Sequence, residues 1–261
     1  RAAQEEIILE LVRQLRRNHP RMGGRKLLYK LQPMLLGEGL KIGRDRLFDL
    51  LRRQDLLVQR KKTYRRTTIP GLFRAPNRLP GLEINRPNQV WVSDITYLEL
   101  EMNRFAYLFV LMDLYSRYIV GWHVASSLAA EGALASLRRA LGQLKTDPAG
   151  LIHHSDHGVQ YTSHAYMNTL LDHDIQASMG AVGNCYDNIF AERLMGILKG
   201  EYYLDTLFVN YSQVTSIVDE VVDLYNTDRP HLSLNLAVPI DVYHGHCDHV
   251  PPVVIPTLEV Q

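Results

Sequence analysis

The sequence is poor in cysteine, in long apolar runs and in net charge, and each shortage excludes a class of protein. Only two cysteines occur in 261 residues, Cys185 and Cys247, too few for a disulfide framework or a four-thiolate zinc site. No apolar run approaches the roughly 20 residues that span a bilayer, and nothing resembles a signal peptide, so we expect a cytoplasmic protein without membrane contact. The chain does not begin with Met, so we expect a fragment of a longer protein.

The small net charge of +1 conceals two parts of opposite charge. Residues 1 to 80 hold 20 Lys and Arg against 7 Asp and Glu, a balance of +13, whereas residues 81 to 261 balance to −12. A basic segment attracts nucleic acid because it neutralises phosphates and releases their counterions. We therefore expect the N-terminal part to bind nucleic acid, and an ordinary solvated basic surface is the alternative.

Apolar spacing predicts three short helices in the basic part. The first contains Ile7, Leu11 and Leu15, the second runs from about residue 24 to 36, and the third lies in the run RDRLFDLLRRQ. The pattern resembles a helix-turn-helix unit, in which the second helix enters the major groove, although a small helical bundle has the same pattern for packing alone. We expect Lys30 to face outward, and the outward residues predicted to contact DNA are Arg25, Lys26, Arg44, Arg46, Arg52 and Arg53.

Helical periodicity stops at residues 59 to 88, which carry a basic cluster followed by four prolines. We interpret this segment as an extended linker between two domains. Its basic cluster is suited to track a phosphate backbone, and a solvated tether is the alternative. The cluster residues predicted to contact DNA are Lys61, Lys62, Arg65 and Arg66.

The acidic part predicts an α/β domain. Runs rich in Val, Ile and aromatic residues predict three antiparallel strands over 89–99, 105–114 and 117–125. Helices and short strands then alternate: helices over 130–144, 163–172 and 212–226 and one around Glu192, with strands over 151–154 and 175–178. Hairpins followed by alternation give a mixed sheet with helices on both faces, in the order of ribonuclease-H-like nucleases.

Three acidic residues in this domain are candidates for chemistry. Asp94 falls in mid-strand among apolar residues, where an ionised carboxylate is costly unless it is paired or binds metal. Asp156 follows a predicted strand, at the edge where α/β sheets place ligands, although such acids also cap helices. Glu192 shares a predicted helical face with Asn188 and Lys199, and a surface ion pair is its alternative.

Converging carboxylates are the ligands that Mg²⁺ or Mn²⁺ prefers. Two such ions about 3.5 to 4 Å apart bind both the attacking and the leaving oxygen of a phosphodiester. Asp94, Asp156 and Glu192, with 35 residues between the last two, therefore predict phosphoryl transfer on DNA or RNA.

The sequence closely resembles the catalytic proteins of bacterial insertion sequences of the insertion-sequence-three family, which are retroviral-integrase-like DDE transposases. The resemblance covers nearly the whole chain and is carried by GGRKLLYKL, VWVSDITYL, DLYSRYIVGW, HHSDHGVQYTS, GNCYDNIFAERLMGILKGEY and YNTDRPHLSLNLAVP. It implies that Asp94, Asp156 and Glu192 are the catalytic, metal-binding triad. It also implies that Lys199 contacts DNA, and we expect Asn188 on the same helical face to do so too.

By this resemblance the protein would cleave the ends of an insertion sequence and transfer the 3′-hydroxyl to target DNA. The expected cofactors are two Mg²⁺ ions per active site, with Mn²⁺ as a substitute. The expected partners are transposon-end DNA, target DNA, further copies in a homodimer or larger assembly, and a protein region from an upstream reading frame; the expected location is the bacterial cytoplasm, near the nucleoid. A ribonuclease-H-like nuclease without strand transfer and a non-catalytic DNA-binding regulator are the alternatives.

Other polar residues are interpreted structurally. We favour packing or solvation for His153, His154 and His157, which flank Asp156. We also favour a structural role for Tyr161 over stacking on bases. The tail residues His244, His246, Cys247 and His249 match no usual zinc spacing. We expect Asn226, Arg229, Pro230 and His231 to end a helix and set a turn. The predicted domains are a basic helical DNA-binding domain at 1–58, a linker at 59–88, a catalytic core at 89–228 and a tail at 229–261.

Overall fold

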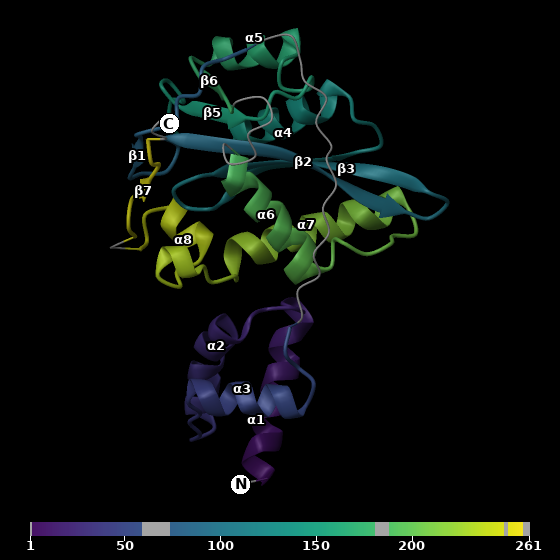
Figure 1. The fold of residues 1–261 in the computed structure, drawn as a ribbon, viewed down its shortest axis with the longest axis vertical. Coiled ribbons are helices and arrows are strands. Elements are labelled where there is room, and N and C mark those ends of the chain that lie inside the picture. The colour runs from purple at the N-terminus through teal and green to yellow at the C-terminus, as the bar shows by residue number, and fades with distance from the viewer. Residues whose placement is uncertain (1, 59–73, 181–187, 248–249, 258–261) are drawn as a thin grey trace.

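The computed structural model describes residues 2–58, 74–180, 188–247 and 250–257. It shows a small helical unit and a larger α/β unit (Figure 1). Each unit has its own apolar core: one cluster fills the helical unit, and two clusters lie on opposite faces of the sheet. No helix in these residues is both long enough and apolar enough to cross a membrane.

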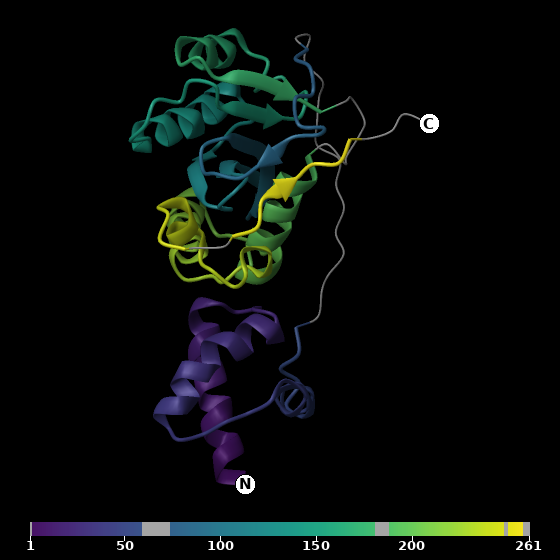
Figure 2. The same cartoon turned by 90° about the vertical axis from the view of Figure 1, so that its left-hand side faces the viewer.

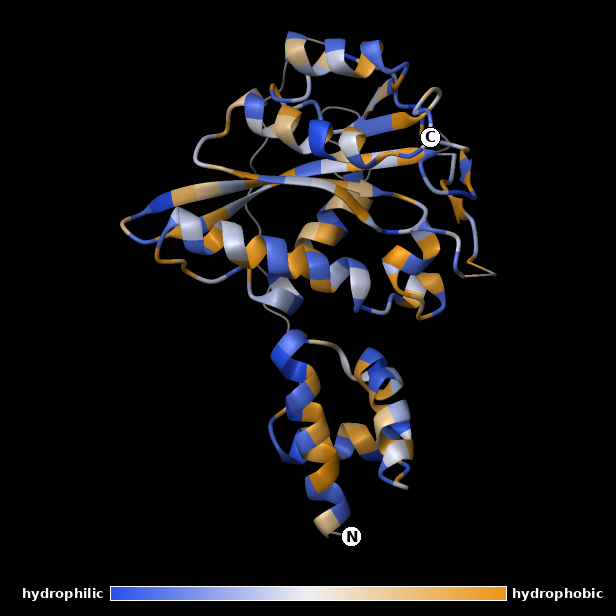
Figure 3. Cartoon of the chain, turned by 180° about the vertical axis from the view of Figure 1, so that it is seen from behind, coloured by the Kyte–Doolittle hydropathy of each residue, from blue (hydrophilic) through white to orange (hydrophobic). Residues whose placement is uncertain are grey.

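The helical unit consists of α1 (Ala2–Asn18), α2 (Gly24–Gly37) and α3 (Arg44–Arg53), as predicted. Its leucines and valines at helical spacing pack into one cluster, and Figure 3 shows the apolar side of α1 turned towards the other helices. Gly24 lets α2 begin close to α3, because a Cβ atom there would lie 2.6 Å from the ring of Phe48.

The α/β unit is built on a five-stranded mixed sheet in the order β4-β3-β2-β5-β6. The strands β2 (Val90–Leu100), β3 (Arg104–Asp113) and β4 (Ile119–Ala125) are antiparallel. β5 (Ile152–Ser155) runs parallel to β2, and β6 (Gln176–Met179) runs parallel to β5. The predicted mixed sheet is confirmed, with strand bounds within one or two residues.

Helices cover both faces of this sheet, as Figure 2 shows. The first face packs against α4 (Ala130–Gln143) and α5 (His164–Asp172), and the second against α6 (Ile189–Tyr202) and α7 (Tyr211–Thr227). Successive side chains of β2 serve opposite faces: Trp91 joins the first core, whereas Val90 and Val92 join the second.

The predicted linker and tail contain structure that the sequence analysis missed. In the linker, β1 (Glu83–Ile84) pairs antiparallel with β7 (Val253–Val254) in the tail. The tail also forms the 3-10 helix η2 (Leu232–Leu234) and the short helix α8 (Pro239–Tyr243), and Val242 of α8 is buried. Two-residue strands carry no periodicity, so nothing local to the sequence marks this pairing.

Candidate active site

Asp94 lies in the middle of the sheet, where β2 pairs with β3 on one side and β5 on the other. Its side chain is half-buried, and its Oδ1 accepts a hydrogen bond of 2.8 Å from the Ile95 N–H. Burial raises the pKa of Asp94 to about 7, and the charge of Asp156 adds to this increase. The Ile95 hydrogen bond and the Lys199 charge oppose it without cancelling it. The positive charge near Asp94 is therefore too small to keep its pKa at the ordinary value of an aspartate.

Asp156 follows the C-terminal end of β5, as predicted. Val92 of β2 and His154 of β5 are register partners in the parallel ladder, and each stands two residues before one of the acids. Strand alternation thus brings Asp94 and Asp156 to the same level on the α6 side of the sheet. Asp156 Oδ1 accepts a hydrogen bond of 3.0 Å from the Gly158 N–H. A Cβ atom at position 158 would lie only 2.9 Å from the same oxygen, so Gly158 gives this carboxylate its room.

The first turn of α6 brings Glu192 towards this pair. Asn188, the residue before α6, is buried and donates from Nδ2 to the Ser93 carbonyl at 3.3 Å, which ties the start of the helix to the residue preceding Asp94. Glu192 itself is exposed, and a carboxylate is favoured near a helix N-terminus. Desolvation still raises the pKa of Glu192 above its ordinary value.

Asp94 is the common neighbour of the other predicted groups. Asp156 and Glu192 both raise its pKa, the former more strongly, and Lys199 lowers it. Among the described residues, no three His, Cys, Asp or Glu side chains are gathered closely enough to hold a metal ion. The close part of the arrangement is thus Asp94 with Asp156, and Glu192 approaches from α6.

Comparisons with known proteins decide the family. Residues 84–185 match a family model described as the integrase core domain, and residues 173–239 match a second model with the same description. The chain is 35% identical over 213 residues to the 31 kDa protein of insertion element IS600 from Shigella sonnei, covering 78% of this chain and 76% of that protein. It is 34% identical over 222 residues to the transposase of insertion sequence element IS629 from the same organism, covering 84% and 73%. The chain belongs to the insertion-sequence transposases.

The predicted family and activity are therefore confirmed: this is a DNA transposase of the insertion-sequence-three type with an integrase-like core. The fold agrees. A simian T-cell lymphotropic virus intasome structure, in complex with the PP2A regulatory subunit B56 gamma, superposes with a TM-score of 0.51. That match is 18% identical and covers 92% of this chain and 75% of the other.

The basic residues predicted to contact DNA divide into three groups in the transposase. The exposed ones lie on α2 and α3 of the helical unit: Arg25, Arg44, Arg46, Arg52 and Arg53. Arg44 and Arg52 form exposed ion pairs with Asp45 and Asp49, whereas Arg46 and Arg53 both contact Glu5, whose side chain is 17% exposed. Exposed pairs contribute little, so Arg44 and Arg52 can exchange a carboxylate for a phosphate. The second group, Lys61, Lys62, Arg65 and Arg66, lies outside the described residues.

Lys26 forms the third group, and its predicted outward position is wrong. Its side chain is 6% exposed and its ammonium lies 2.7 Å from both carboxylate oxygens of Glu201 on α6. The outward placement of Lys30 is also wrong, because Lys30 forms an ion pair with Asp228 after α7. Helical spacing could not reveal this, because both partners lie more than 170 residues away.

The histidines beside Asp156 pack inside the protein, as favoured. His153 Nε2 lies 2.8 Å from the Tyr166 hydroxyl, and burial lowers the pKa of His153 to about 3, so the ring is neutral. His154 Nδ1 lies 2.8 Å from the Ser178 hydroxyl. Tyr161 is also buried in the α5-side core. His153 and Tyr161 therefore pack on the α5 side of β5, whereas His154, the register partner of Val92, is buried on the opposite face.

The motif YNTDRPH has the structural role expected of it, and a further one that sequence reasoning missed. Asn226 accepts from the Ile119 N–H at 2.8 Å and donates to the Ile119 carbonyl at 3.0 Å, which attaches the end of α7 to β4. Arg229 is 4% exposed and donates twice to Glu201. The motif thus joins α7 to the end of α6, where the helical unit also makes contact.

Proposed function

We propose that this transposase cleaves the ends of its insertion sequence and joins the exposed 3′-hydroxyl to target DNA, with Asp94, Asp156 and Glu192 as the catalytic metal ligands. One observation carries the proposal. A mid-sheet carboxylate stands beside a second one on the parallel neighbour, and burial with the charge of Asp156 raises the pKa of Asp94 to about 7. Such a pair is stable in its ionised form only beside added positive charge.

The donor chemistry fits divalent hard cations. The three groups offer carboxylate oxygens and no thiolate or imidazole, which suits Mg²⁺, with Mn²⁺ as a substitute. When bound, two ions would activate the attacking oxygen and neutralise the leaving oxygen of the phosphodiester. Both other acids act on the pKa of Asp94, so Asp94 is the carboxylate best suited to contact both ions.

The chain's own residues position the reacting groups. Asn188 fixes the first turn of α6 to β2 and so sets where Glu192 stands. Lys199 lies on the same helix, near enough to lower the pKa of Asp94, and would hold a DNA phosphate there. The exposed arginines of the helical unit would bind transposon-end DNA, so that end recognition and cutting occupy separate units.

The assembly follows from the reaction. Joining two ends to one target requires two active sites, so we propose a dimer or larger assembly on DNA, in the bacterial cytoplasm. The fold neighbour comes from an intasome, which supports this assembly. We also propose that a protein region from an upstream reading frame takes part, and that the units divide near residues 58, 88 and 228.

A strand-transfer assay with end DNA and Mg²⁺ tests the proposal. Asp94→Asn, Asp156→Asn and Glu192→Gln should each lower cleavage by at least about 100-fold, the size expected when one group that stabilises the transition state is removed. Glu131→Gln, an exposed acid in the first turn of α4, is the matched control and should cut normally. Chelation of divalent metal should abolish cleavage of the wild-type protein.

The outcomes separate the candidate functions. Undiminished cleavage by the three variants rejects the metal site. Cleavage without any joined product supports a nuclease, and end binding without cleavage in either Mg²⁺ or Mn²⁺ supports a regulator.

A further inference from the structure

The C-terminal end of α6 is capped by the helical unit. Arg21, in the connection between α1 and α2, donates its backbone N–H to the Glu201 carbonyl at 3.2 Å and its Nη1 to the Gly200 carbonyl at 3.4 Å. The same guanidinium lies 4.0 Å from the centre of the Tyr203 ring. The last carbonyls of a helix have no partner within it and form the negative end of its dipole. The helical unit thus supplies hydrogen bonds that α6 lacks.

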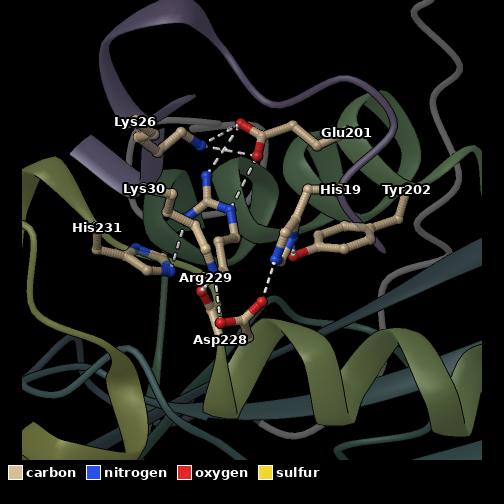
Figure 4. A network of polar contacts seen from close by, with 8 residues as sticks. All are labelled: His19, Lys26, Lys30, Glu201, Tyr202, Asp228, Arg229 and His231. Atoms are coloured by element: carbon tan, nitrogen blue, oxygen red, sulfur yellow. Dashed lines mark hydrogen bonds and ion pairs between the residues drawn. The ribbon is translucent and has the colours of Figure 1, made fainter. Parts of the chain in front are cut away.

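Glu201 receives cations from both units at once (Figure 4). Lys26 reaches it from α2 at 2.7 Å, and Arg229 reaches it from the core through Nε at 2.9 Å and Nη2 at 3.0 Å. Burial alone would raise the pKa of Glu201, but hydrogen bonds and charge from Arg229 and Lys26 hold it below its ordinary value. Glu201 is therefore ionised and partly exposed, and its two cations, Lys26 and Arg229, are buried.

Asp228 forms a second contact of the same kind beside the first (Figure 4). His19 Nε2 lies 2.7 Å from its carboxylate, and Lys30 donates to both its carboxylate and its carbonyl. Desolvation lowers the pKa of His19 although Asp228 opposes this, which favours the neutral ring. In that form Nε2 donates to Asp228 and Nδ1 accepts from the Tyr202 hydroxyl at 3.1 Å.

The helix held in this way is the one that carries Glu192. An α-helix rises about 1.5 Å per residue, so the nine steps from Glu192 to Glu201 span about 13.5 Å. Asn188 ties the beginning of α6 to the strand of Asp94. The same helix therefore contacts the acids at its first turn and the helical unit at its last (Figure 1).

We propose that His19, Arg21, Lys26 and Lys30 are positioning residues of the transposase. Together with Glu201 and Asp228 they form an interdomain latch, which holds the helical unit in one orientation so that the DNA bound to it is presented correctly to the three acids. Misplacement of reacting atoms by about 1 Å can cost about 100-fold in rate, so orientation matters as much as binding. The latch rests on the proposed function, which supplies both the DNA contact and the acids.

The latch is best tested from the helical side. Lys26→Met with Lys30→Met removes two cations, whereas Glu201 keeps both hydrogen bonds from Arg229 and the core stays paired. We expect small-angle X-ray scattering of the full chain to show a larger radius of gyration. Affinity for end DNA should stay within about threefold, because neither lysine is proposed to contact DNA. Cleavage of the bound end should fall about tenfold or more, because the bound end is no longer held in place beside the acids. Lys41→Met, which removes one exposed cation from the same unit, should change neither the radius of gyration nor the cleavage of the bound end.

Rescue and folding controls make the result decisive. Lys26→Arg, made in the protein that retains Lys30, keeps a cation opposite Glu201. This variant should retain most of the cleavage that the double variant loses. If the double variant fails to fold by circular dichroism, Asp228→Asn tests the second contact from the core side. Unchanged size, or a larger size with normal cleavage, overturns the latch. A loss of DNA affinity that accounts for the lost cleavage also overturns it, because Lys26 would then be a DNA contact. Failure of the proposed function would appear differently, in the wild-type protein and in the acid variants.

Discussion

At the scale of single residues, two carboxylates on the sheet, the fully buried Asp113 and the half-buried Asp94, have different surroundings. Asp113 is fully buried, and it accepts from the Ser116 N–H at 2.8 Å, the Ser116 hydroxyl at 2.6 Å and the Asn88 N–H at 2.7 Å. Its hydrogen-bond acceptors are therefore used by Ser116 in the turn between β3 and β4 and by Asn88 before β2. Asp94 accepts from one backbone N–H, and no other residue that the structure describes donates a hydrogen bond to its carboxylate. The first carboxylate holds a turn, and the second is available for chemistry.

Asp113 predicts a pH dependence of stability. Burial raises the pKa of Asp113 to about 6 although the hydrogen bonds from Ser116 and Asn88 oppose this. The folded state therefore binds this proton more tightly than the unfolded state, so its contribution to stability is greatest below about pH 4 and is lost as the pH rises through about 6. Urea unfolding measures this effect. The free energy of unfolding of Asp113→Asn, relative to that of the wild type, should rise by on the order of 2 kcal/mol from pH 4 to pH 7.

The exposed Asp172→Asn serves as the control for that measurement, and its difference from wild type should stay nearly constant. If the Asp113→Asn difference is equally constant, the raised pKa is rejected.

At the scale of elements, β4 and α4 approach more closely than ordinary side chains permit. A Cβ atom on Gly121 of β4 would lie 2.3 Å from the Ser136 carbonyl of α4 and 2.9 Å from the Ala140 Cβ. Backbone cannot move aside as a side chain can. Gly121 is thus required by the packing of the helix on the sheet.

Gly121→Ala should destabilise the protein by about 2 kcal/mol or more, at the upper end of the cost of overpacking, since backbone must move. Gly142→Ala on α4 is the matched change, because a Cβ there meets nothing within 4 Å. It should stabilise by up to about 1 kcal/mol through helix propensity. Thermal unfolding of the two variants checks both signs, and equal effects would contradict the close approach.

The regular elements were predictable because their signals are local. The leucines of α1 to α3 and the alternation in β2 to β4 repeat within a few residues, and Asp94, Asp156 and Glu192 stand in distinctive motifs. Partners far apart in sequence were not predictable. Helical spacing predicts that Lys26 is exposed to solvent. Its side chain is buried only because α2 lies against α6, beside Glu201.

At the scale of the whole molecule, the proposed function assigns the opposite charges of the two parts to separate tasks, DNA binding and chemistry. The exposed arginines lie on the helical unit, whereas the acids lie in the core. If the proposed site is correct, charge repulsion should keep DNA from the acids unless cations are present. The ion pairs of the latch, Lys26 with Glu201 and Lys30 with Asp228, also join the two parts through their opposite charges.

The affinity for end DNA should fall steeply with salt. If the five exposed arginines Arg25, Arg44, Arg46, Arg52 and Arg53 each neutralise one phosphate, the logarithm of the association constant falls with a slope of about −4.5 against the logarithm of salt concentration. Each Arg→Gln change should reduce the magnitude of that slope by about 0.9. Titrations by fluorescence anisotropy at several salt concentrations measure it. Arg104→Gln on the β2–β3 hairpin should leave the slope unchanged, and arginine variants that do likewise would disprove the contact.

The pairing of β1 with β7 has a consequence for modularity. Glu83 and Val254 are register partners although 170 residues separate them, so the chain enters and leaves the core at neighbouring points. A unit whose entry and exit are adjacent can be inserted into another chain, or permuted, without stretching its sheet. The β1–β7 pair thus holds the two ends of the α/β unit together. We expect that the segments flanking this unit can be exchanged without displacing Asp94 and Asp156.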